Sequence, residues 1–354
     1  MTGIPSPERI KPSVSLPPKP KILIIKLRSI GDVIYNTAIY TPIKKTWPDA
    51  HLTVVVEPPS YEIVRYHPDI DKVLIFDKST LANQVNFYWN LYKENYDIAI
   101  DMHEGPRGAG MCFLSSAYHK VGNKFAPRSF AYNTKIDFSD FKPKHPMDYQ
   151  VALIKKLGVE FDQPKPNIFI PEHIHERADR LLIEKGTPDS FYVMHSGARP
   201  YDQWQSQKFA DLAKIINQQY GLKVVLTCGP GQENTVEKII RKIENIPYVF
   251  LQAGLNELAA ITKRSKFVVC HNGGYMHLSA AVGTPTIALF GTSSPDIWGP
   301  LSTNHIILRH KPDQSFLSPK TMHRLGIQKD PSGKEFITVE EALSAVNKIL
   351  ISAK

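Results

Sequence analysis

A glycine-containing turn between a predicted strand and a predicted helix is the feature of this sequence best suited to bind an anion. The apolar run Phe267–Cys270 predicts a buried parallel strand, Asn272, Gly273 and Gly274 follow it, and His277 lies one turn into a mostly apolar helix. A helix start offers unpaired N–H groups and the positive end of its dipole, and glycine lets a phosphate approach the backbone. These residues are candidate phosphate ligands, although a plain strand–turn–helix unit with a core histidine fits the pattern equally well.

Asp32 is the candidate catalytic residue. It follows Gly31 at the start of a predicted helix, after the apolar strand Lys21–Lys26, so its carboxylate could accept a proton from a hydroxyl group. The alternative is an acidic residue that only satisfies a helix N-terminus. A dinucleotide-binding motif is a poor rival, because this turn has one glycine where three are expected.

Two further turns carry candidate ligands for a nucleotide. The first follows the predicted strand Phe191–Met194, and its small residues and single guanidinium suit a diphosphate; they are Ser196, Gly197, Ala198 and Arg199. The second follows Lys223–Thr227, where Gly229 and Glu233 could contact a ribose. Arg199 is equally well read as a surface residue and Glu233 as a helix cap. Trp204 is predicted to be a core residue at the start of the next helix.

Composition restricts the class of protein. A net charge of +9 and a pI near 9.2 favour acidic partners, such as phosphorylated substrates or an anionic membrane surface. Basic residues are scattered and no nucleic-acid motif is present, so we expect no nucleic-acid partner. The three cysteines lie far apart, no apolar run could span a membrane, and no signal-peptide pattern begins the chain. We therefore expect a cytoplasmic protein with at most peripheral membrane contact.

Two pairs of residues resemble metal ligands but are discounted. Asp69 and Asp71 form a DxD sequence that lies in a loop after Pro68, where acidic residues are ordinary. His173 and His175 are two positions apart on a predicted helix and therefore face different ways.

Short apolar runs alternate with helical stretches in two series, which predicts two doubly wound parallel sheets with ligands at the carboxyl ends of the strands. A proline-rich arm occupies residues 1–20, a first domain 21–160, a second domain 161–335 and a terminal helix 336–354, with the linker inside Gly158–Asn167. Residues Asn123–Lys144 show no period and are predicted to be a surface loop. Strands are predicted at Lys21–Lys26, His51–Val56, Val73–Phe76, Asp97–Asp101, Lys120–Gly122, Phe191–Met194, Lys223–Thr227, Tyr248–Gln252, Phe267–Cys270 and Thr286–Phe290. Helices are predicted from Val33 to the residue before Trp47 and at Tyr61–Tyr66, Leu81–Tyr92, His145–Leu157, Pro171–Lys185, Ser206–Tyr220, Gly231–Ile243, Glu257–Arg264 and Val339–Ile351.

Three stretches together resemble the signature regions of glycosyltransferase family 9, the ADP-heptose:lipopolysaccharide heptosyltransferases of Gram-negative bacteria. They are residues 21–56, which contain KLRSIGDV, residues 195–216, which begin HSGARP, and residues 270–300, which begin CHNGGYMHL. The resemblance implies a GT-B architecture in which two Rossmann-like domains face each other across a cleft. It implies an inverting, metal-independent transfer without a cofactor, with the acceptor on the first domain and the ADP-sugar on the second.

Carried over residue by residue, the resemblance makes Asp32 the general base. It assigns the donor's phosphates to Ser196, Gly197, Ala198, Arg199, Asn272, Gly273, Gly274 and His277. The nucleoside would meet Gly229, Glu233 and Leu255, and the acceptor Arg28, Ser29, Gly31 and His103.

Four positions depart from the family pattern. Asp202 stands where a basic residue is usual, Asn272 where an aspartate is usual, and Gln205 and Tyr275 where prolines are common. Losing a cation beside a diphosphate removes roughly 1.5–3 kcal/mol of binding, so either Arg199 or another cation compensates or donor binding differs.

The leading hypothesis is a heptosyltransferase that acts on an anionic lipopolysaccharide core, at the inner face of the inner membrane. The alternatives are a GT-B enzyme with another donor or acceptor, and a nucleotide-sugar-binding protein that has lost turnover. A nucleotide-sugar epimerase on the same scaffold is disfavoured, because this sequence lacks the acidic and histidine motifs of that family.

Overall fold

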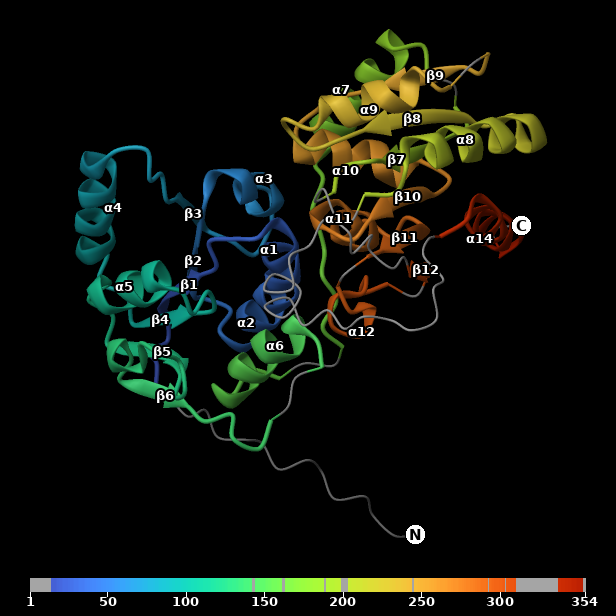
Figure 1. Ribbon diagram of the computed structural model, residues 1–354. Coiled ribbons are helices and arrows are strands. Elements are labelled where there is room, and N and C mark those ends of the chain that lie inside the picture. The colour runs from blue at the N-terminus through green and yellow to red at the C-terminus, as the bar shows by residue number, and fades with distance from the viewer. Residues whose placement is uncertain are drawn as a thin grey trace, which may run out of the picture. The chain divides into compact units, whose positions relative to one another are not determined.

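The computed structural model describes residues 14–141, 144–160, 163–187, 189–198, 203–243, 245–291, 293–302, 304–309 and 337–352. The chain forms two compact units, residues 1–166 and 167–354 (Figure 1). Most of the predicted proline-rich arm, residues 1–13, lies outside the described residues. Within the described residues, no helix is both long and apolar enough to cross a membrane.

The first unit is built on a six-stranded, entirely parallel sheet in the order β3-β2-β1-β4-β5-β6. In its strand β1 the apolar residues Ile22 to Ile25 are fully buried, because both faces of the sheet are covered. The strands are β1 (Lys21–Ile25), β2 (His51–Val56), β3 (Lys72–Ile75), β4 (Ile98–Asp101), β5 (His119–Asn123) and β6 (Thr134–Ile136). The helices are α1 (Ile30–Asn36), η1 (Thr37–Ile39), α2 (Tyr40–Thr46), η2 (Pro58–Ser60), α3 (Tyr61–Val64), α4 (Leu81–Lys93), α5 (Pro106–Leu114), η3 (Ser129–Ala131) and α6 (Pro146–Lys156).

The prediction of a surface loop over 123–144 is wrong. This stretch contains η3 and the edge strand β6, which pairs with β5 from Val121↔Thr134 to Asn123↔Ile136. Three residues are too few for a hydrophobic period, and the strand is instead fixed by its ladder and by the buried Tyr132 beside it. Residues 142 and 143 lie outside the described part of the chain.

The single helix predicted from Val33 is divided into α1, η1 and α2. The hydroxyl of Thr37 donates to the carbonyl of Ile34 at 2.6 Å, and the chain tightens into a 3-10 turn. The break places Pro42 in the first turn of α2, where its missing N–H needs no partner in the helix.

The second unit repeats the arrangement, with a parallel sheet in the order β12-β11-β10-β7-β8-β9. Helix α14 packs on α8 and contributes Ala342, Val346 and Ile349 to the unit's core. The strands are β7 (Phe191–His195), β8 (Lys223–Thr227), β9 (Tyr248–Phe250), β10 (Val268–His271), β11 (Thr286–Phe290) and β12 (His305–Arg309). The helices are α7 (Glu172–Glu184), α8 (Ser206–Tyr220), α9 (Glu233–Ile240), α10 (Leu255–Arg264), α11 (Gly274–Ala281), α12 (Pro295–Trp298) and α14 (Val339–Ser352). Strand β12 was not predicted.

Each sheet has one point where the strand order reverses. In the first unit this point lies between β1 and β4, and in the second between β7 and β10. In doubly wound sheets, ligands bind beyond the carboxyl ends of the strands at this reversal. The segments that leave β1, β4, β7 and β10 are therefore where the candidate residues must be sought.

Candidate functional site

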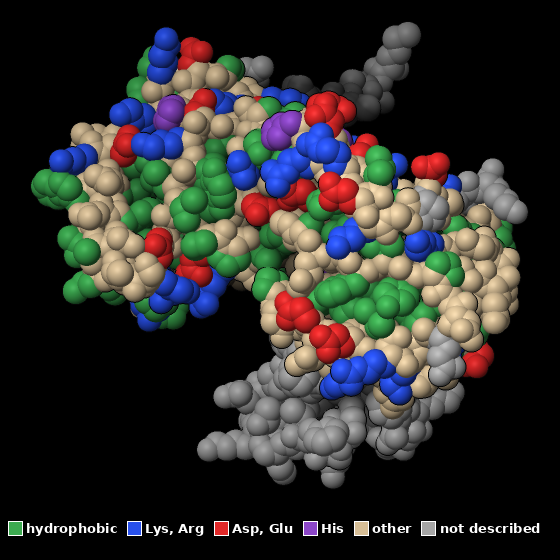
Figure 2. All heavy atoms as spheres, turned by 90° about the horizontal axis from the view of Figure 1, so that it is seen from above, with side chains coloured by type: hydrophobic (Ala, Val, Ile, Leu, Met, Phe, Trp, Pro, Cys, Tyr) green, Lys and Arg blue, Asp and Glu red, His purple; other side chains and the backbone are tan. Residues whose placement is uncertain are grey.

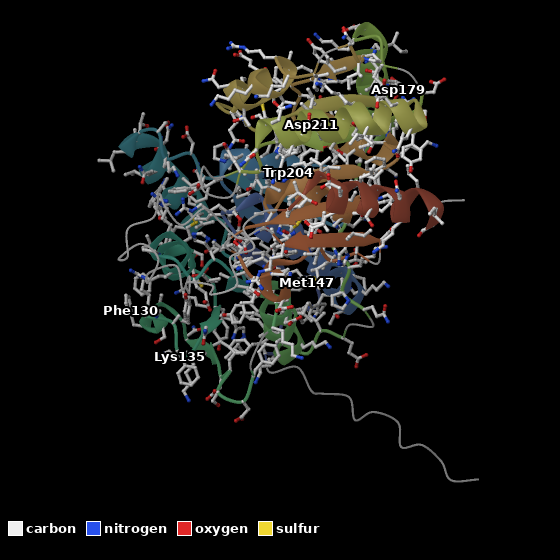
Figure 3. All side chains as sticks on the ribbon, turned by 45° about the vertical axis from the view of Figure 1, so that its right-hand side comes forward. Phe130, Lys135, Met147, Asp179, Trp204 and Asp211 are labelled. Carbon is white, nitrogen blue, oxygen red and sulfur yellow. The ribbon has the colours of Figure 1, made fainter. Side chains whose placement is uncertain are left out.

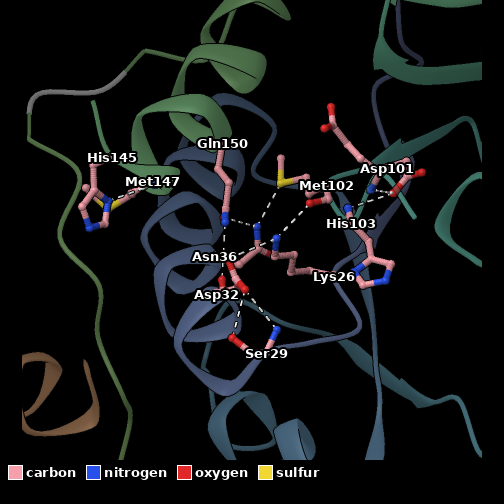
Figure 4. Close-up of polar contacts among 11 residues, drawn as sticks. Lys26, Ser29, Asp32, Asn36, Asp101, Met102, His103, His145, Met147 and Gln150 are labelled. Atoms are coloured by element: carbon pink, nitrogen blue, oxygen red, sulfur yellow. Dashed lines mark hydrogen bonds and ion pairs between the residues drawn. The ribbon is translucent and has the colours of Figure 1, made fainter. Parts of the chain in front are cut away.

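Asp32 lies in the segment that leaves β1, at the third position of α1. Its Oδ2 accepts hydrogen bonds from the backbone N–H of Ser29 at 3.1 Å and from the Ser29 hydroxyl at 3.0 Å (Figure 4). The side chain is 22% exposed. The helix-capping role that the sequence left open is therefore present, and it holds the carboxylate in one orientation at the carboxyl end of the sheet.

Lys26 joins Asp32 to the segment that leaves β4. Its buried ammonium group donates to the carbonyl of Met102 at 3.0 Å and lies 3.6 Å from Asp32 Oδ1. The backbone of the same aspartate is also tied to α6, because Gln150 donates to the Asp32 carbonyl at 3.4 Å. Sequence reasoning missed Lys26 as a site residue. A lysine at the end of an otherwise apolar buried strand was the available signal.

Four residues predicted to contact the acceptor lie in these same two segments. Arg28 and Ser29 are exposed, Gly31 is buried in the first turn of α1, and His103 follows β4. Burial lowers the pKa of His103, and the positive charges of Lys26 and Arg28 lower it further. Its imidazole is therefore neutral at neutral pH and can exchange hydrogen bonds with a hydroxyl group.

A buried carboxylate shapes the loop after β4. Asp101 Oδ1 accepts from the backbone N–H groups of His103 at 2.8 Å and Glu104 at 3.0 Å, and Oδ2 accepts from the Tyr132 hydroxyl at 2.8 Å. Burial raises the pKa of Asp101, while these hydrogen bonds oppose the rise. Asp101 was not a predicted site residue, and it acts by fixing the backbone that carries His103.

Gly108 leaves room for this carboxylate. A Cβ at that position would lie 2.4 Å from Asp101 Oδ1, and three hydrogen bonds prevent the carboxylate from moving away. We expect Gly108→Ala to lower the free energy of unfolding by about 1–3 kcal/mol through overpacking. Gly110→Ala on the same helix is the matched control, because its Cβ would meet only Tyr88 Oη at 3.7 Å. Urea unfolding that finds both variants equally stable would contradict this account of the loop.

In the second unit, the segment that leaves β7 carries Ser196, Gly197 and Ala198. Ser196 is fully buried, and its hydroxyl oxygen has no hydrogen-bond partner among the described residues. Gln232, at the start of α9, donates from Nε2 to the Ala198 carbonyl at 3.2 Å. A Cβ on Gly197 would lie 2.3 Å from Gln232 Oε1, so this glycine permits the close approach. Gln232 was not among the predicted residues, and it connects the segment that leaves β7 to the segment that leaves β8.

The segment that leaves β10 forms the glycine turn. The backbone N–H of Asn272 donates to Leu289 at 3.0 Å and Gly274 begins α11, while a Cβ on Gly273 would meet nothing within 4 Å. The space beside Gly273 is therefore open among the described residues. His277 is buried one turn into the helix.

The two segments of the second unit are joined by a stacked pair. The rings of His195 and Tyr275 lie 4.1 Å apart at an angle of 4°, and the Tyr275 hydroxyl pairs with Thr262 at 2.6 Å. Tyr275, which departs from the family pattern, thus fixes the start of α11 against the end of β7.

The predicted nucleoside residues lie at the same carboxyl edge. Glu233 accepts from the backbone N–H of Gly231 at 3.1 Å and from Gln252 at 2.7 Å, which links the segments after β8 and β9. Gly229 approaches Gln232, and Leu255 begins α10. These bonds hold the turn before α9, whose N-cap residue is Gln232, and the partly exposed carboxylate of Glu233 can still meet a ligand.

Three predictions concern the segment between β7 and α8. Arg199 and Asp202 lie outside the described residues. Trp204 is a core residue, as predicted, with its indole N–H donating to the Ile337 carbonyl at 2.9 Å; α8 begins two residues after it. Its backbone N–H donates to His271 Nε2 at 2.8 Å.

His195 gives this unit a defined pH dependence. Burial, with a smaller contribution from His271, lowers its pKa from 6.5 to about 3. Between these values the unfolded chain binds a proton that the folded chain does not, so stability falls as the pH falls below about 6.5. We expect the wild type to lose about 1.4 kcal/mol per pH unit more than His195→Gln between about pH 6 and pH 4. Parallel stability curves from chemical unfolding would contradict a neutral buried His195.

The two aspartates that were discounted as metal ligands have structural roles. Asp71 Oδ2 accepts from Lys44 and from the backbone N–H of Leu52, both at 2.7 Å, and Asp69 accepts from the Thr41 hydroxyl at 2.5 Å. Among the described residues, no group of three or more His, Cys, Asp or Glu side chains could hold a metal ion.

The chain has a GT-B architecture, with two Rossmann-like units that each carry candidate residues at the topological reversal of the sheet. Solved structures of glycosyltransferases have the same fold. A glycosyl transferase of family 9 from Veillonella parvula DSM 2008 has a TM-score of 0.79 at 23% identity, covering 94% of this chain and 97% of its own. The E. coli heptosyltransferase WaaC with ADP has a TM-score of 0.72 at 21% identity, covering 93% and 99%.

Sequence comparison gives the family. Lipopolysaccharide heptosyltransferase 3 of Escherichia coli strain K12 is 24% identical over 340 residues, which is 92% of this chain and 96% of the relative. The family model of glycosyltransferase family 9 (heptosyltransferase) matches residues 85–323. The chain belongs to glycosyltransferase family 9, and the resemblance found in the sequence is confirmed.

Proposed function

We propose that this protein transfers a heptose from ADP-heptose to a lipopolysaccharide core acceptor. Family membership supports the transferase class, and a full-length relative named as a lipopolysaccharide heptosyltransferase supports the acceptor. The structural neighbour solved with ADP supports the nucleotide. The observation that carries the proposal is the placement of Asp32, held by Ser29 and Lys26 at the topological reversal of the first sheet.

In this mechanism Asp32 is the general base. Its carboxylate takes the proton of the acceptor hydroxyl as the hydroxyl oxygen attacks the anomeric carbon, and the bond between that carbon and the diphosphate breaks. The products are the glycosylated acceptor and ADP. A single displacement of this kind inverts the anomeric configuration. Arg28, Ser29 and His103 would position the acceptor.

The second unit would stabilise the departing diphosphate. Backbone N–H groups at the start of α11, beyond Asn272 and Gly273, present the positive end of a helix dipole at the open space described above. The hydroxyl of Ser196, which has no hydrogen-bond partner among the described residues, would supply another donor. Arg199 and His277 would add positive or polar contacts, so that no metal ion or other cofactor is required.

A second candidate is a protein that binds nucleotide sugars without turnover. It is favoured by Asp202 and Asn272, which replace a basic and an acidic residue of the family pattern. The same two departures are also explained by an active enzyme that uses a different sugar nucleotide as its donor.

The test is a transfer assay with purified protein, ADP-heptose and a lipopolysaccharide core that lacks the added heptose. We expect ADP release to depend on the acceptor, to survive EDTA and to give a product of inverted anomeric configuration by NMR. Calorimetric binding of ADP-heptose without transfer would establish the second candidate instead. Faster transfer from ADP-glucose would overturn the choice of donor, and loss of activity in EDTA would overturn metal independence.

The proposed location is the cytoplasmic side of the inner membrane, with the protein attached peripherally. The positive net charge is the supporting observation, because the acceptor is anionic and held in a membrane.

A further inference from the structure

The first unit exposes large aromatic side chains that its core does not use. Trp89 is 56% exposed, Tyr118 77% and Phe130 76%. Exposed apolar side chains scattered singly are normal, whereas a contiguous group marks an interaction surface. We call the following residues the aromatic–basic face: Trp89, Tyr92, Lys93, Phe113, Tyr118, Lys120, Lys124, Phe125 and Phe130.

These residues come from elements that lie side by side. Helix α5 packs against both α4 and η3, and the Ser116 hydroxyl after α5 donates to the Tyr92 carbonyl at 2.6 Å. The side-chain amide of Asn133 donates to the Tyr118 carbonyl at 2.7 Å, which attaches the start of β5 to the segment after η3. Figure 1 shows α4, α5 and β5 along one edge of the first unit, and Phe130 and Lys135 project outward from that edge in Figure 3.

Lysines are interleaved with the aromatic rings. The ammonium nitrogen of Lys93 lies 4.7 Å from the centre of the Trp89 ring, that of Lys120 5.7 Å from Phe113, and that of Lys124 5.6 Å from Phe125. Lys124 also pairs with Asp137 at 2.9 Å. Figure 2 shows green hydrophobic and blue basic side chains side by side on the first unit.

We propose that the aromatic–basic face docks on an anionic phospholipid bilayer. Tryptophan and tyrosine rings are stable at the level of lipid headgroups, because one part of the ring is apolar and the other forms hydrogen bonds. Lysine stems lie along apolar surface while their charged ends reach lipid phosphates, and each contributes about 1 kcal/mol near an anionic membrane. The combination of rings and cations fits a lipid surface better than an apolar protein partner.

The inference deepens the peripheral membrane contact of the proposed function by naming the surface and the lipid charge. It rests on the proposed function only for the choice of the inner membrane as the surface, because binding to vesicles requires neither Asp32 nor the glycine turn after β10. The docked edge would hold the first unit, which carries the proposed acceptor residues, against the membrane.

The test is co-sedimentation of the full chain with phosphatidylcholine vesicles that contain or lack phosphatidylglycerol. We expect binding only with phosphatidylglycerol and a loss of binding at high salt. Lys93→Gln with Lys120→Gln should weaken partitioning roughly thirtyfold, at about 1 kcal/mol per lysine. The double variant Trp89→Ser with Phe113→Ser should also weaken partitioning, even into vesicles with a high content of phosphatidylglycerol. Lys238→Gln with Lys263→Gln, and Ile183→Ser, are matched exposed controls on the second unit and should bind as the wild type does.

Unchanged partitioning in both face variants would overturn the inference, as would equal binding to neutral vesicles. A third outcome would also overturn it. If the wild type did not bind vesicles but formed a dimer in gel filtration, and the Trp89→Ser, Phe113→Ser double variant were a monomer, the face would join two copies of the chain instead. Transfer to a water-soluble core fragment separates the two proposals. Variants of the aromatic–basic face should retain this transfer activity. A wild type that binds vesicles but shows no transfer would contradict the proposed function and leave the membrane-docking proposal standing.

Discussion

Asp32→Asn is expected to lower kcat for heptose transfer by about a thousandfold, because a positioned general base contributes 10²–10⁴-fold in rate. KM for ADP-heptose should change little, since the proposed donor contacts lie in the second unit. Asparagine retains an oxygen that can accept the hydrogen bonds from Ser29 to Asp32 Oδ2, so the cap of α1 should survive. Steady-state kinetics and a thermal melt of the same preparation measure both effects.

Asp148→Asn provides the matched control for this experiment. Asp148 is also the third residue of a helix, α6, and accepts from the backbone N–H of His145 at 2.9 Å, as Asp32 does from Ser29. The control matches the change at the helix cap but not the loss of the ion pair with Lys26, so it should cost no more stability than Asp32→Asn and should leave kcat within about twofold. Equal losses of activity in the two variants would show that Asp32 acts through the helix cap and not as a base.

Gly273→Val is expected to raise KM for ADP-heptose by about tenfold to a hundredfold. The backbone at Gly273 is extended (φ 165°), so valine can adopt it, and a Cβ there meets nothing within 4 Å. The side chain would enter the space proposed for the diphosphate and displace at least one charge-assisted hydrogen bond, which contributes about 1.5–3 kcal/mol.

Gly273→Ala should give an intermediate KM, and both variants should melt near the wild-type temperature. Isothermal titration with ADP alone reports the same loss without catalysis. Wild-type affinity in Gly273→Val would mean that the donor's phosphates bind elsewhere. A large loss of stability would mean that this space is needed by the protein itself.

The fold was largely predictable because buried parallel strands leave a simple pattern. Strands covered on both faces are continuous apolar runs, and His51–Val56, Lys223–Thr227 and Thr286–Phe290 were predicted with the bounds that the structure shows. The edge strands β6 and β12 were missed. Thr134–Ile136 has one buried residue, and no residue of His305–Arg309 is fully buried, so neither produces a hydrophobic period.

The site was predictable where topology alone places residues. Asp32 and the turn at 272–274 follow strands β1 and β10, and strand order brings each to a reversal of its sheet. Residues that act through long-range contacts were not predictable. Asp101 reaches Tyr132 across 31 positions and Gln232 reaches Ala198 across 34, and nothing local in the sequence indicates either pair.

The most direct test of the central claim is a crystal structure of the protein with a fluorinated, non-transferable ADP-heptose analogue. We expect diphosphate oxygens within hydrogen-bond distance of the backbone N–H groups of residues 273–277, and an anomeric carbon that faces the Asp32 carboxylate with room for one hydroxyl group between them. A diphosphate bound away from this turn, or an anomeric carbon that Asp32 cannot approach through an acceptor hydroxyl, would contradict it.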